Sequence, residues 1–510
     1  MKYDCIIIGA GIGGLTCAAD LARKGVKVLL CEKFIHAGGT ASVFHRNGYK
    51  FPAGPLSFSF PSYVDNTLKE LGIKERINFK RSHFQFKSQN IDVILSLPFK
   101  ELTKELGQFS HEDESGISSF FEIMRDLAKA QMEILAESRE FQKIQSQEHL
   151  NTDFTKKERS RLLTKYQTIS AKELAEKLVK NDLLRVLLSS QSFEESNMSA
   201  LLAARMWDMI AKTGIWYPDI GFDGINNLLV KTIIDAGGEL RFSSPVYKIT
   251  MSNGCANGII LKSGEHIAAD TIVSTVDHRL TFFNMIGEEF IPNDFAKWVK
   301  SLQDSGSIFC VYLGINASNV NLKAFKADHI FYRDSMGEAQ PWHENISSKD
   351  FFSGREYEIC LWSGKDIHNA PHGKDALLLR ANAPYNFFEK WRTPDGGRTK
   401  GYYEYKNRVS KYFIEAAENL LPGLSSAVEV MDASTPLTYQ TWGGGSEGAC
   451  AGWSWDRNDE MGTAFKSLIR TPVPNLYMAG YQAFSQLIIG GYATAMHSGN
   501  VVANMIVRQN

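Results

Sequence analysis

The stretch KYDCIIIGAGIGGLTCAADLARKGVKVLLCE, residues 2–32, decides the fold of this 510-residue chain. Its isoleucine run at Ile6–Ile8 is typical of a short strand buried on both faces, as in a parallel sheet. Glycines follow in G-x-G-x-x-G spacing, and a helical apolar pattern then continues as far as Gly25. A second apolar strand ends at Glu32. The stretch therefore predicts a βαβ unit at the start of the chain.

Each part of this unit suits a ligand that carries a pyrophosphate. Gly9 permits the tight turn, Gly11 lets a pyrophosphate approach the backbone, and Gly14 lets the helix pack close to the strand. The helix N-terminus supplies free N–H groups and the positive end of a dipole. Glu32 can accept hydrogen bonds from an adenosine ribose, and its charge disfavours the 2′-phosphate of NADP. FAD and NAD both remain open on this motif alone. The predicted contacts here are Gly9, Gly11, Gly13, Gly14, Glu32 and Lys33.

A second strand, turn and helix pattern lies near the C-terminus. Asn475–Gly480 predicts a short buried strand, and Gly490 and Gly491 predict a glycine turn. Small and apolar residues at helical spacing follow the turn. Two such units at opposite ends of the sequence predict one domain assembled from both ends of the chain.

The segment His36–Ser42 holds the glycine pair Gly38 and Gly39, and with the C-terminal pattern it resembles a large flavoprotein group. That group includes amine oxidases, phytoene desaturases, carotenoid isomerases and retinol saturases. The resemblance implies FAD as the cofactor, with the pair along its pyrophosphate and ribityl chain and the C-terminal glycines near its isoalloxazine ring. Many members have Arg where this chain has Thr40. The resemblance adds these contacts: Gly38, Gly39, Thr40, Pro55, Val246, Gly480, Gly490, Gly491 and Tyr492.

Three shorter stretches narrow the resemblance to one branch. Gly48–Pro55 resembles the GYxFDxGP motif of phytoene desaturases and carotenoid isomerases, with Pro52 in place of the Asp. Asp366–Lys374 resembles their DPxxAPxG motif. Ala433–Pro436, together with residues 445–452, resembles the stretch that precedes their last segment. The chain is thus similar to the phytoene desaturase, carotenoid isomerase and retinol saturase branch.

The resemblance implies an α/β fold. We expect a Rossmann-like FAD-binding domain of the GR2 type, interrupted by a mixed sheet-plus-helix substrate domain. In this group the last residue of an "SSPV" segment, here Val246, lies beside the adenine. The expected FAD-binding domain comprises residues 1–80, 215–285 and 430–510, and the expected substrate domain comprises residues 81–214 and 286–429.

The first part of the expected substrate domain is rich in amphipathic helical patterns. In the related group such insertions form the substrate domain, and some of their helices dip into one membrane leaflet. An amphipathic helix is more often part of a domain core, which is the interpretation we favour. Peripheral contact with a membrane stays open. The most regular pattern comprises Ile117, Phe120, Phe121, Met124, Leu127, Ala128 and Leu135.

Composition excludes several classes of protein. The formal net charge of −1 gives no reason to expect a nucleic-acid partner. Seven cysteines with no C-x-x-C pair argue against a disulfide framework or a metal site, and they favour a cytoplasmic location. No uncharged apolar run reaches the roughly 18 residues that span a bilayer. The oligomeric state stays open.

The leading hypothesis is an FAD-dependent oxidoreductase that acts on C–C or C=C bonds of a polyprenoid, carotenoid or retinoid-like substrate. Hydride exchange at flavin N5 requires positioning in a dry pocket, so we expect no conspicuous catalytic motif. The alternatives are a reduced-FAD cis–trans isomerase of a polyene, a flavin amine oxidase, and a non-catalytic lipid carrier that retains FAD. Four candidate acids or bases, each expected to be structural, lie near the C-terminal segment: Tyr439, Trp442, Glu447 and His497.

Overall fold

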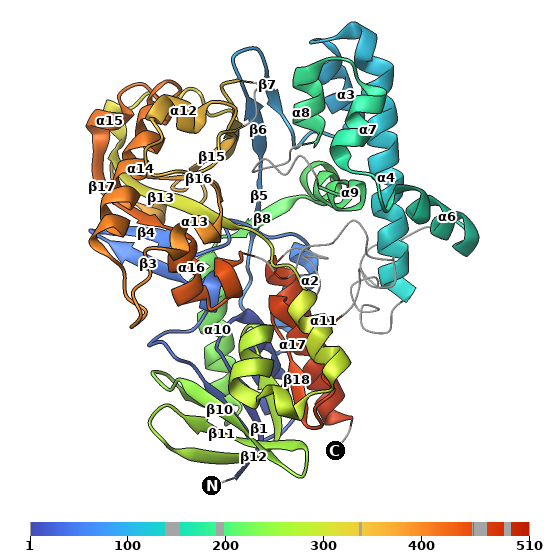
Figure 1. The fold of residues 1–510 in the computed structure, drawn as a ribbon, viewed down its shortest axis with the longest axis vertical. Helices are drawn as coiled ribbons and strands as arrows, with labels where there is room; N and C mark the ends of the chain where they lie inside the picture. The colour runs from blue at the N-terminus through green and yellow to red at the C-terminus, as the bar shows by residue number, and fades with distance from the viewer. Residues whose placement is uncertain are drawn as a thin grey trace.

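A computed structural model describes residues 2–137, 154–189, 198–335, 339–450, 452, 467–483 and 491–508. The described chain forms two large sheets, each with its own helices, and a separate group of helices (Figure 1). Within these ranges, no helix is both long and apolar enough to cross a membrane.

The first sheet has seven strands and contains both ends of the chain. Its order is β10-β11-β12-β1-β2-β9, and β18 pairs with β12. Strands β9, β2, β1, β12 and β18 run parallel, whereas β10 and β11 form an antiparallel extension. The bounds are β1 Lys2–Ile8, β2 Val28–Cys31, β9 Glu239–Arg241, β10 Val246–Ser252, β11 Cys255–Leu261, β12 His266–Ser274 and β18 Leu476–Met478.

The strand β1 is buried because its isoleucines face helices on both sides of the sheet. Ile6 and Ile7 have no exposed surface, and the whole of β2 is buried. Helix α1 ends at Arg23, and Gly25 follows with φ +80°, a conformation that ends a helix without strain. The helices associated with this sheet are α1 Ile12–Arg23, α2 Pro61–Glu70, α10 Gly221–Asp235, α11 Asn293–Ser301 and α17 Gly491–Val507.

The second sheet also has seven strands and is mixed. Its order is β17-β13-β16-β15-β14-β6-β7, and only the β14–β6 pair is parallel. One face packs on α14, through a core that includes Phe309, Val409 and Phe413. The bounds are β6 Phe84–Lys87, β7 Asp92–Ile94, β13 Ser307–Asn316, β14 His329–Tyr332, β15 Tyr357–Leu361, β16 Lys374–Ala383 and β17 Val428–Ser434, with α12 Ser348–Phe352, α13 Tyr385–Glu389, α14 Lys400–Glu418, α15 Leu424–Ala427 and α16 Pro436–Gly443.

The amphipathic region between residues 81 and 214 forms a compact helical group, at the upper right of Figure 1. Ile117, Phe120 and Met124 on α4 have no exposed surface and belong to a shared apolar core. The expectation that this helix is domain core is therefore confirmed. The helices are α3 Phe99–Gly107, α4 Glu114–Glu137, α6 Lys156–Tyr166, α7 Ala171–Leu178, α8 Asp182–Ser189 and α9 Ala200–Asp208.

Two further antiparallel pairs of strands form short ribbons outside the two large sheets. β3 Val43–Arg46 pairs with β4 Tyr49–Pro52, and β5 Phe79–Ser82 pairs with β8 Ile215–Pro218. The first ribbon packs against the second sheet, where the ring of Tyr49 occupies the space that a side chain at Gly314 would fill. The ribbon is therefore fixed to the second sheet by aromatic contacts, which include Phe44 and Phe51 on Tyr312.

A buried ionic cluster crosses the second sheet on the face opposite to α14. Glu358 on β15 lies directly opposite Arg380 on β16 and accepts a hydrogen bond from its Nε at 2.6 Å. Glu358 also accepts a hydrogen bond from Nδ1 of His329. Burial raises the pKa of Glu358, but the Arg380 guanidinium and His329 outweigh that effect and hold the pKa well below its usual range. Burial lowers the pKa of His329, so the imidazole is neutral at neutral pH.

We predict that Glu358→Gln lowers the free energy of unfolding by about 3–5 kcal/mol, because it leaves the Arg380 charge without its buried partner. The lowered pKa means that the wild-type carboxylate stabilises the fold above pH about 4.3, and that this stability is lost as the pH falls. The variant has no carboxylate at this position, so its free energy of unfolding should not show this decrease at low pH. Urea denaturation between pH 3 and pH 7 measures both effects.

The matched control is Glu415→Gln on the exposed side of α14, which should change the free energy of unfolding by less than about 0.5 kcal/mol. Equal losses in the two variants would contradict a role for the buried pair.

Candidate functional site

A cleft of about 330 Å³ lies where the parallel strands of the first sheet end. Ile8 ends β1, Cys31 ends β2, and Thr275 directly follows β12. Ligands of open α/β sheets bind at the carboxyl ends of the strands, and small-molecule sites commonly measure roughly 300–1,000 Å³. The position and size of this cofactor cleft therefore suit a dinucleotide.

The turn between β1 and α1 leaves room for a phosphate at one glycine and none at two others. A side chain at Gly11 would meet no atom within 4 Å, whereas one at Gly14 would collide with the Gly9 carbonyl and one at Gly9 with Thr275. The first turn of α1 carries no acidic residue, so its N–H groups and dipole face the cleft unopposed. The open space at Gly11 is where a pyrophosphate fits.

Glu32 is held in place at the end of β2. Its Oε2 accepts a hydrogen bond from the Ala10 N–H at 2.7 Å, and its Oε1 accepts one from the Phe34 N–H at 2.9 Å. Each carboxylate oxygen has a further lone pair. Glu32 lines the cleft and can therefore accept from ribose hydroxyls without moving.

The second glycine loop packs directly on the first. The Gly38 N–H donates to the Ala10 carbonyl at 2.8 Å, and Gly38 has φ +114°, which favours glycine. A side chain at Gly39 would press against Cα of Gly11 at 3.1 Å. Asn226 on α10 donates to the Ala41 carbonyl at 2.9 Å and so fixes the end of the loop.

The C-terminal segment closes the other side of the cleft. Gly480 has φ +88°, lines the cleft, and donates its N–H to Oγ of Ser498 at 2.6 Å. A side chain at Gly13 would lie 2.6 Å from the Gly480 nitrogen and 2.9 Å from the Ala495 carbonyl. The two ends of the chain are thus in backbone contact at the cofactor cleft.

The C-terminal end of α16 covers the cleft from outside. Trp442, Gly443 and Gly444 all line it, and the Trp442 ring stacks on Phe34 with centroids 4.8 Å apart. Lys33 donates from Nζ to the Thr441 carbonyl at 3.2 Å, and burial lowers the pKa of its ammonium. The sequence did not predict that Trp442, Gly443 and Gly444 lie over the cofactor cleft, because the residue pattern of α16 does not indicate which part of the fold the helix packs against.

Comparison with known proteins agrees with this geometry. A protein-family profile described as "Flavin containing amine oxidoreductase" matches residues 12–348. The chain belongs to this family. Prolycopene isomerase from Daucus carota is 27% identical over 86% of this chain and 70% of its own length. All-trans-retinol 13,14-reductase from Danio rerio is 23% identical over 99% of this chain and 86% of its own length. A putrescine oxidase double mutant of known structure covers 100% of this chain and 99% of its own, with 16% identity and a TM-score of 0.63.

FAD is therefore the cofactor, and the chain is an FAD-dependent oxidoreductase with a Rossmann-like FAD-binding fold and a second, sheet-plus-helix part. The glycine cradle and Glu32 fit the ADP half of FAD. The expected resemblance to the carotenoid isomerase and retinol saturase branch is confirmed.

Most of the predicted cofactor contacts lie around the cofactor cleft. Gly14 packs helix on strand instead of lining the cleft, and Pro55 does not line the cleft either. Gly491 begins α17, Tyr492 is buried behind it, and Gly490 lies outside the described residues. The predicted residues that line the cleft are Gly9, Gly11, Gly13, Glu32, Lys33, Gly38, Gly39, Thr40, Val246 and Gly480.

Three lining residues that the sequence analysis did not name lie one to three residues past the ends of β12 and β18, a position that could have indicated them. Thr275 follows β12 and donates from Oγ1 to the Ile8 carbonyl at 2.8 Å, and Asp277 lies close behind it. Tyr481 follows Gly480 and also lines the cleft. The neighbouring Gln482 faces away, with its Oε1 3.0 Å from Nδ1 of the buried His278.

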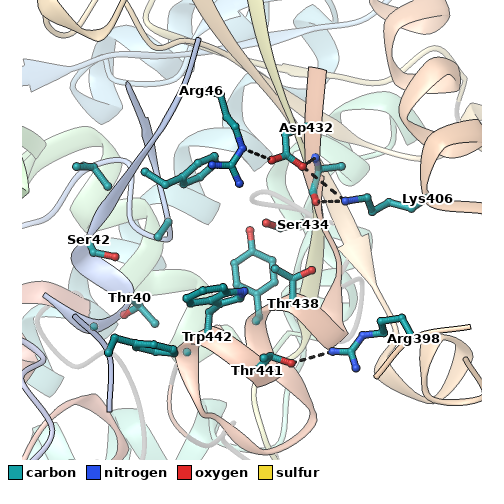
Figure 2. A pocket seen from close by; sticks show the side chains of 18 of the residues that line it. Thr40, Ser42, Arg46, Arg398, Lys406, Asp432, Ser434, Thr438, Thr441 and Trp442 are labelled. Carbon is teal, nitrogen blue, oxygen red and sulfur yellow. Dashed lines mark hydrogen bonds and ion pairs between the residues drawn. The ribbon is translucent and has the colours of Figure 1, made fainter. Parts of the chain in front are cut away.

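A second cleft of about 540 Å³ adjoins the cofactor cleft (Figure 2). It lies between the β3–β4 ribbon, β17, α14 and α16, and several of its residues also line the cofactor cleft. We call it the outer cleft. The shared residues are Phe34, Gly39, Thr40, Trp442 and Gly443.

Of the four candidate acids and bases, Tyr439 and Trp442 line the outer cleft together, whereas Glu447 and His497 line neither cleft. Tyr439 lines the outer cleft 3.4 Å from the Tyr312 hydroxyl, and burial raises its pKa well above the usual value. His497 is buried on α17, with Nδ1 3.0 Å from the Tyr63 hydroxyl of α2. Glu447 is exposed at a left-handed turn with φ +54°. Catalytic roles for these residues stay a prediction.

We predict that Gly11→Ala lowers FAD affinity at least about tenfold while leaving the FAD-free fold intact. Gly11 has φ −70° and open space, so the added methyl group meets only the ligand. The ratio of flavin to protein absorbance after dialysis against limiting FAD measures the affinity, and thermal unfolding of the FAD-free protein measures the fold.

The contrasting variant is Gly14→Ala, whose methyl group would collide with the Gly9 carbonyl and should lower the midpoint of thermal unfolding even without FAD. Normal FAD loading in Gly11→Ala would contradict the assigned pyrophosphate position.

Proposed function

We propose that the chain changes C–C or C=C bonds of a lipophilic polyprenoid, carotenoid or retinoid-like substrate. The observation that carries this proposal is similarity over most of the chain to a prolycopene isomerase and an all-trans-retinol 13,14-reductase. The names of those two proteins indicate polyene substrates. The chain covers 70% of the length of the first and 86% of the length of the second.

An aromatic cluster packs near the start of α17. Tyr492 is 3% exposed and packs on Phe58 with centroids 5.4 Å apart and on Phe222 at 5.1 Å. Tyr217 extends the cluster to Trp362, with centroids 5.2 Å apart. These rings belong to the buried core, and their packing keeps water out of the region beside α17, which agrees with the dry surroundings that hydride exchange needs.

When bound, FAD supplies hydride exchange at N5. The residues of this chain then have to hold a substrate against the cofactor at near-attack geometry and keep water out. This requirement agrees with the scattered positions of Tyr439, Glu447 and His497, since positioning needs no assembled acid–base set.

The second candidate is cis–trans isomerisation of a polyene with reduced FAD and no net redox change. The similarity to prolycopene isomerase favours it. Amine oxidation is the third candidate, favoured by the family description and by the fold of putrescine oxidase. A cytoplasmic location with peripheral membrane contact remains part of the proposal.

The test incubates FAD-loaded protein anaerobically with a poly-cis carotene, with all-trans-retinol and with putrescine, in the oxidised and dithionite-reduced states. We expect a polyene product only, measured by chromatography and mass spectrometry. A product with a pair of hydrogens gained or lost indicates saturation or desaturation, and a product of unchanged mass indicates isomerisation. Flavin bleaching by putrescine, with no change in either polyene, would contradict the proposal.

A further inference from the structure

The outer cleft combines an aromatic wall with a cationic rim. Figure 2 shows Arg46, Lys406 and Arg398 around the pocket, with Trp442 on the side nearer Thr40. Phe44, Tyr402 and Tyr439 supply further aromatic surface. Asp432 is the one carboxylate among the residues that line this cleft.

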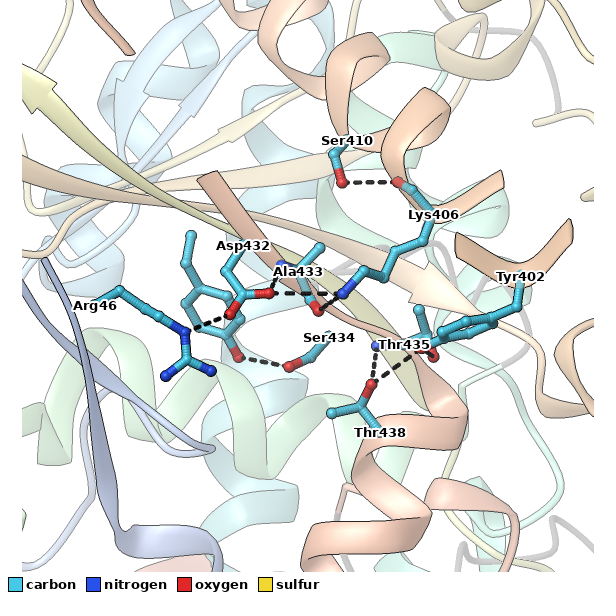
Figure 3. Close-up of polar contacts among 10 residues, drawn as sticks. Arg46, Tyr402, Lys406, Ser410, Asp432, Ala433, Ser434, Thr435 and Thr438 are labelled. Atoms are coloured by element: carbon cyan, nitrogen blue, oxygen red, sulfur yellow. Dashed lines mark hydrogen bonds and ion pairs between the residues drawn. The ribbon is translucent and has the colours of Figure 1, made fainter. Parts of the chain in front are cut away.

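Asp432 is already shared by two of the three cations. Its Oδ2 accepts from Arg46 Nε at 2.9 Å, and its Oδ1 lies 3.6 Å from Lys406 Nζ (Figure 3). Lys406 also donates to the Ala433 carbonyl at 2.9 Å. One negative charge therefore faces two positive charges on this side of the cleft.

Arg398 has only neutral acceptors in the part of the chain that the structure describes. Its Nη2 donates to the Leu437 carbonyl and to Oγ1 of Thr441, both at 2.8 Å. Its Nη1 donates to the carbonyls of Gly396 and Gly397 at 2.9 Å. The cleft thus carries a net positive charge that its own side chains do not neutralise.

The guanidinium groups are fixed before any ligand arrives. The Arg46 guanidinium carbon lies 5.1 Å from the centroid of the Phe44 ring, and that of Arg398 lies 5.7 Å from the Tyr402 ring. The Tyr402 hydroxyl is in turn 2.9 Å from Oγ1 of Thr435. A fixed guanidinium loses little entropy when it pairs with an anion, and its planar fork matches a carboxylate.

The cleft leads from the surface to the cofactor. Trp442 is 56% exposed at the mouth, whereas Thr40 and Gly39 lie where this cleft meets the cofactor cleft. A chain that enters past Trp442 and points inward would therefore reach the cofactor with its apolar end.

We propose that the outer cleft binds the carboxylate head of a lipophilic substrate, whose chain runs along the aromatic wall toward Thr40. This inference rests on the proposed function and names the substrate class as an anionic amphiphile. A pure hydrocarbon would offer the cationic rim no negative charge. It would also displace water from these cations, which costs free energy. A carboxylate head neutralises the rim, in which the charge of Arg398 faces no carboxylate of the cleft.

The test compares all-trans-retinoate with all-trans-retinol, which share a carbon skeleton and differ in the head group. Binding to the FAD-loaded protein is measured by isothermal titration calorimetry. Retinoate should bind at least about tenfold more tightly than retinol, and rising ionic strength should weaken the binding of retinoate only. Arg398→Gln should lower retinoate affinity about tenfold and leave retinol affinity unchanged, whereas Arg398→Lys should retain part of the preference.

The control is Lys411→Gln, which removes an exposed cation from the same helix as Lys406 but outside the cleft, and should change neither affinity. Equal affinities for the two polyenes, or equal losses of retinoate affinity in Lys411→Gln and Arg398→Gln, would overturn the inference. Turnover of retinol without any preference for retinoate would leave the proposed function standing and remove this inference alone. Failure of both polyenes to bind would remove both.

Discussion

The packing of α1 against α17 is the contact on which the cofactor cleft depends. A side chain at Gly499 would collide with the Gly13 carbonyl and approach the Cys17 nitrogen at 3.0 Å, so the two helices touch through backbone. Gly13 in turn leaves room for Gly480 and for the Ala495 carbonyl. This close approach sets the β1–α1 turn beside the C-terminal segment, although the two are separated by nearly the whole chain.

The parallel pairing of the strands also brings distant segments of the chain to the cofactor cleft. β18 pairs with β12, and β12 pairs with β1, so the carboxyl ends of these strands meet at one edge. Side chains that follow the strands then line one cleft, as Glu32 does after β2 and Thr275 after β12. α16 contributes Trp442 and Gly443 to both clefts, whereas the β3–β4 ribbon contributes to the outer cleft alone.

The nucleotide-binding unit could be predicted from the sequence because its signals are local. Three isoleucines in a row, glycines at fixed spacing and an acid at the next strand end define β1, α1 and β2 without reference to distant residues. The C-terminal strand and helix were predictable for the same reason. The domain boundaries stay a prediction.

The outer cleft could not be predicted, because its charged residues come from separate segments with no common motif. Arg46 lies on β3, Arg398 just before α14, and Asp432 on β17. The pairing of Glu358 with Arg380 likewise depends on the register of β15 and β16, which residue patterns do not determine. Gln482, two residues past the predicted strand end at Gly480, pairs with His278, a contact that only the packed structure reveals.

The central claim is that residues from both ends of the chain form one FAD site. The most direct test is the absorbance spectrum of the purified protein before and after anaerobic dithionite, with the released cofactor identified by mass. The account predicts bands near about 370 and 450 nm that bleach on reduction, together with release of FAD. A colourless protein that neither carries nor takes up FAD would contradict it.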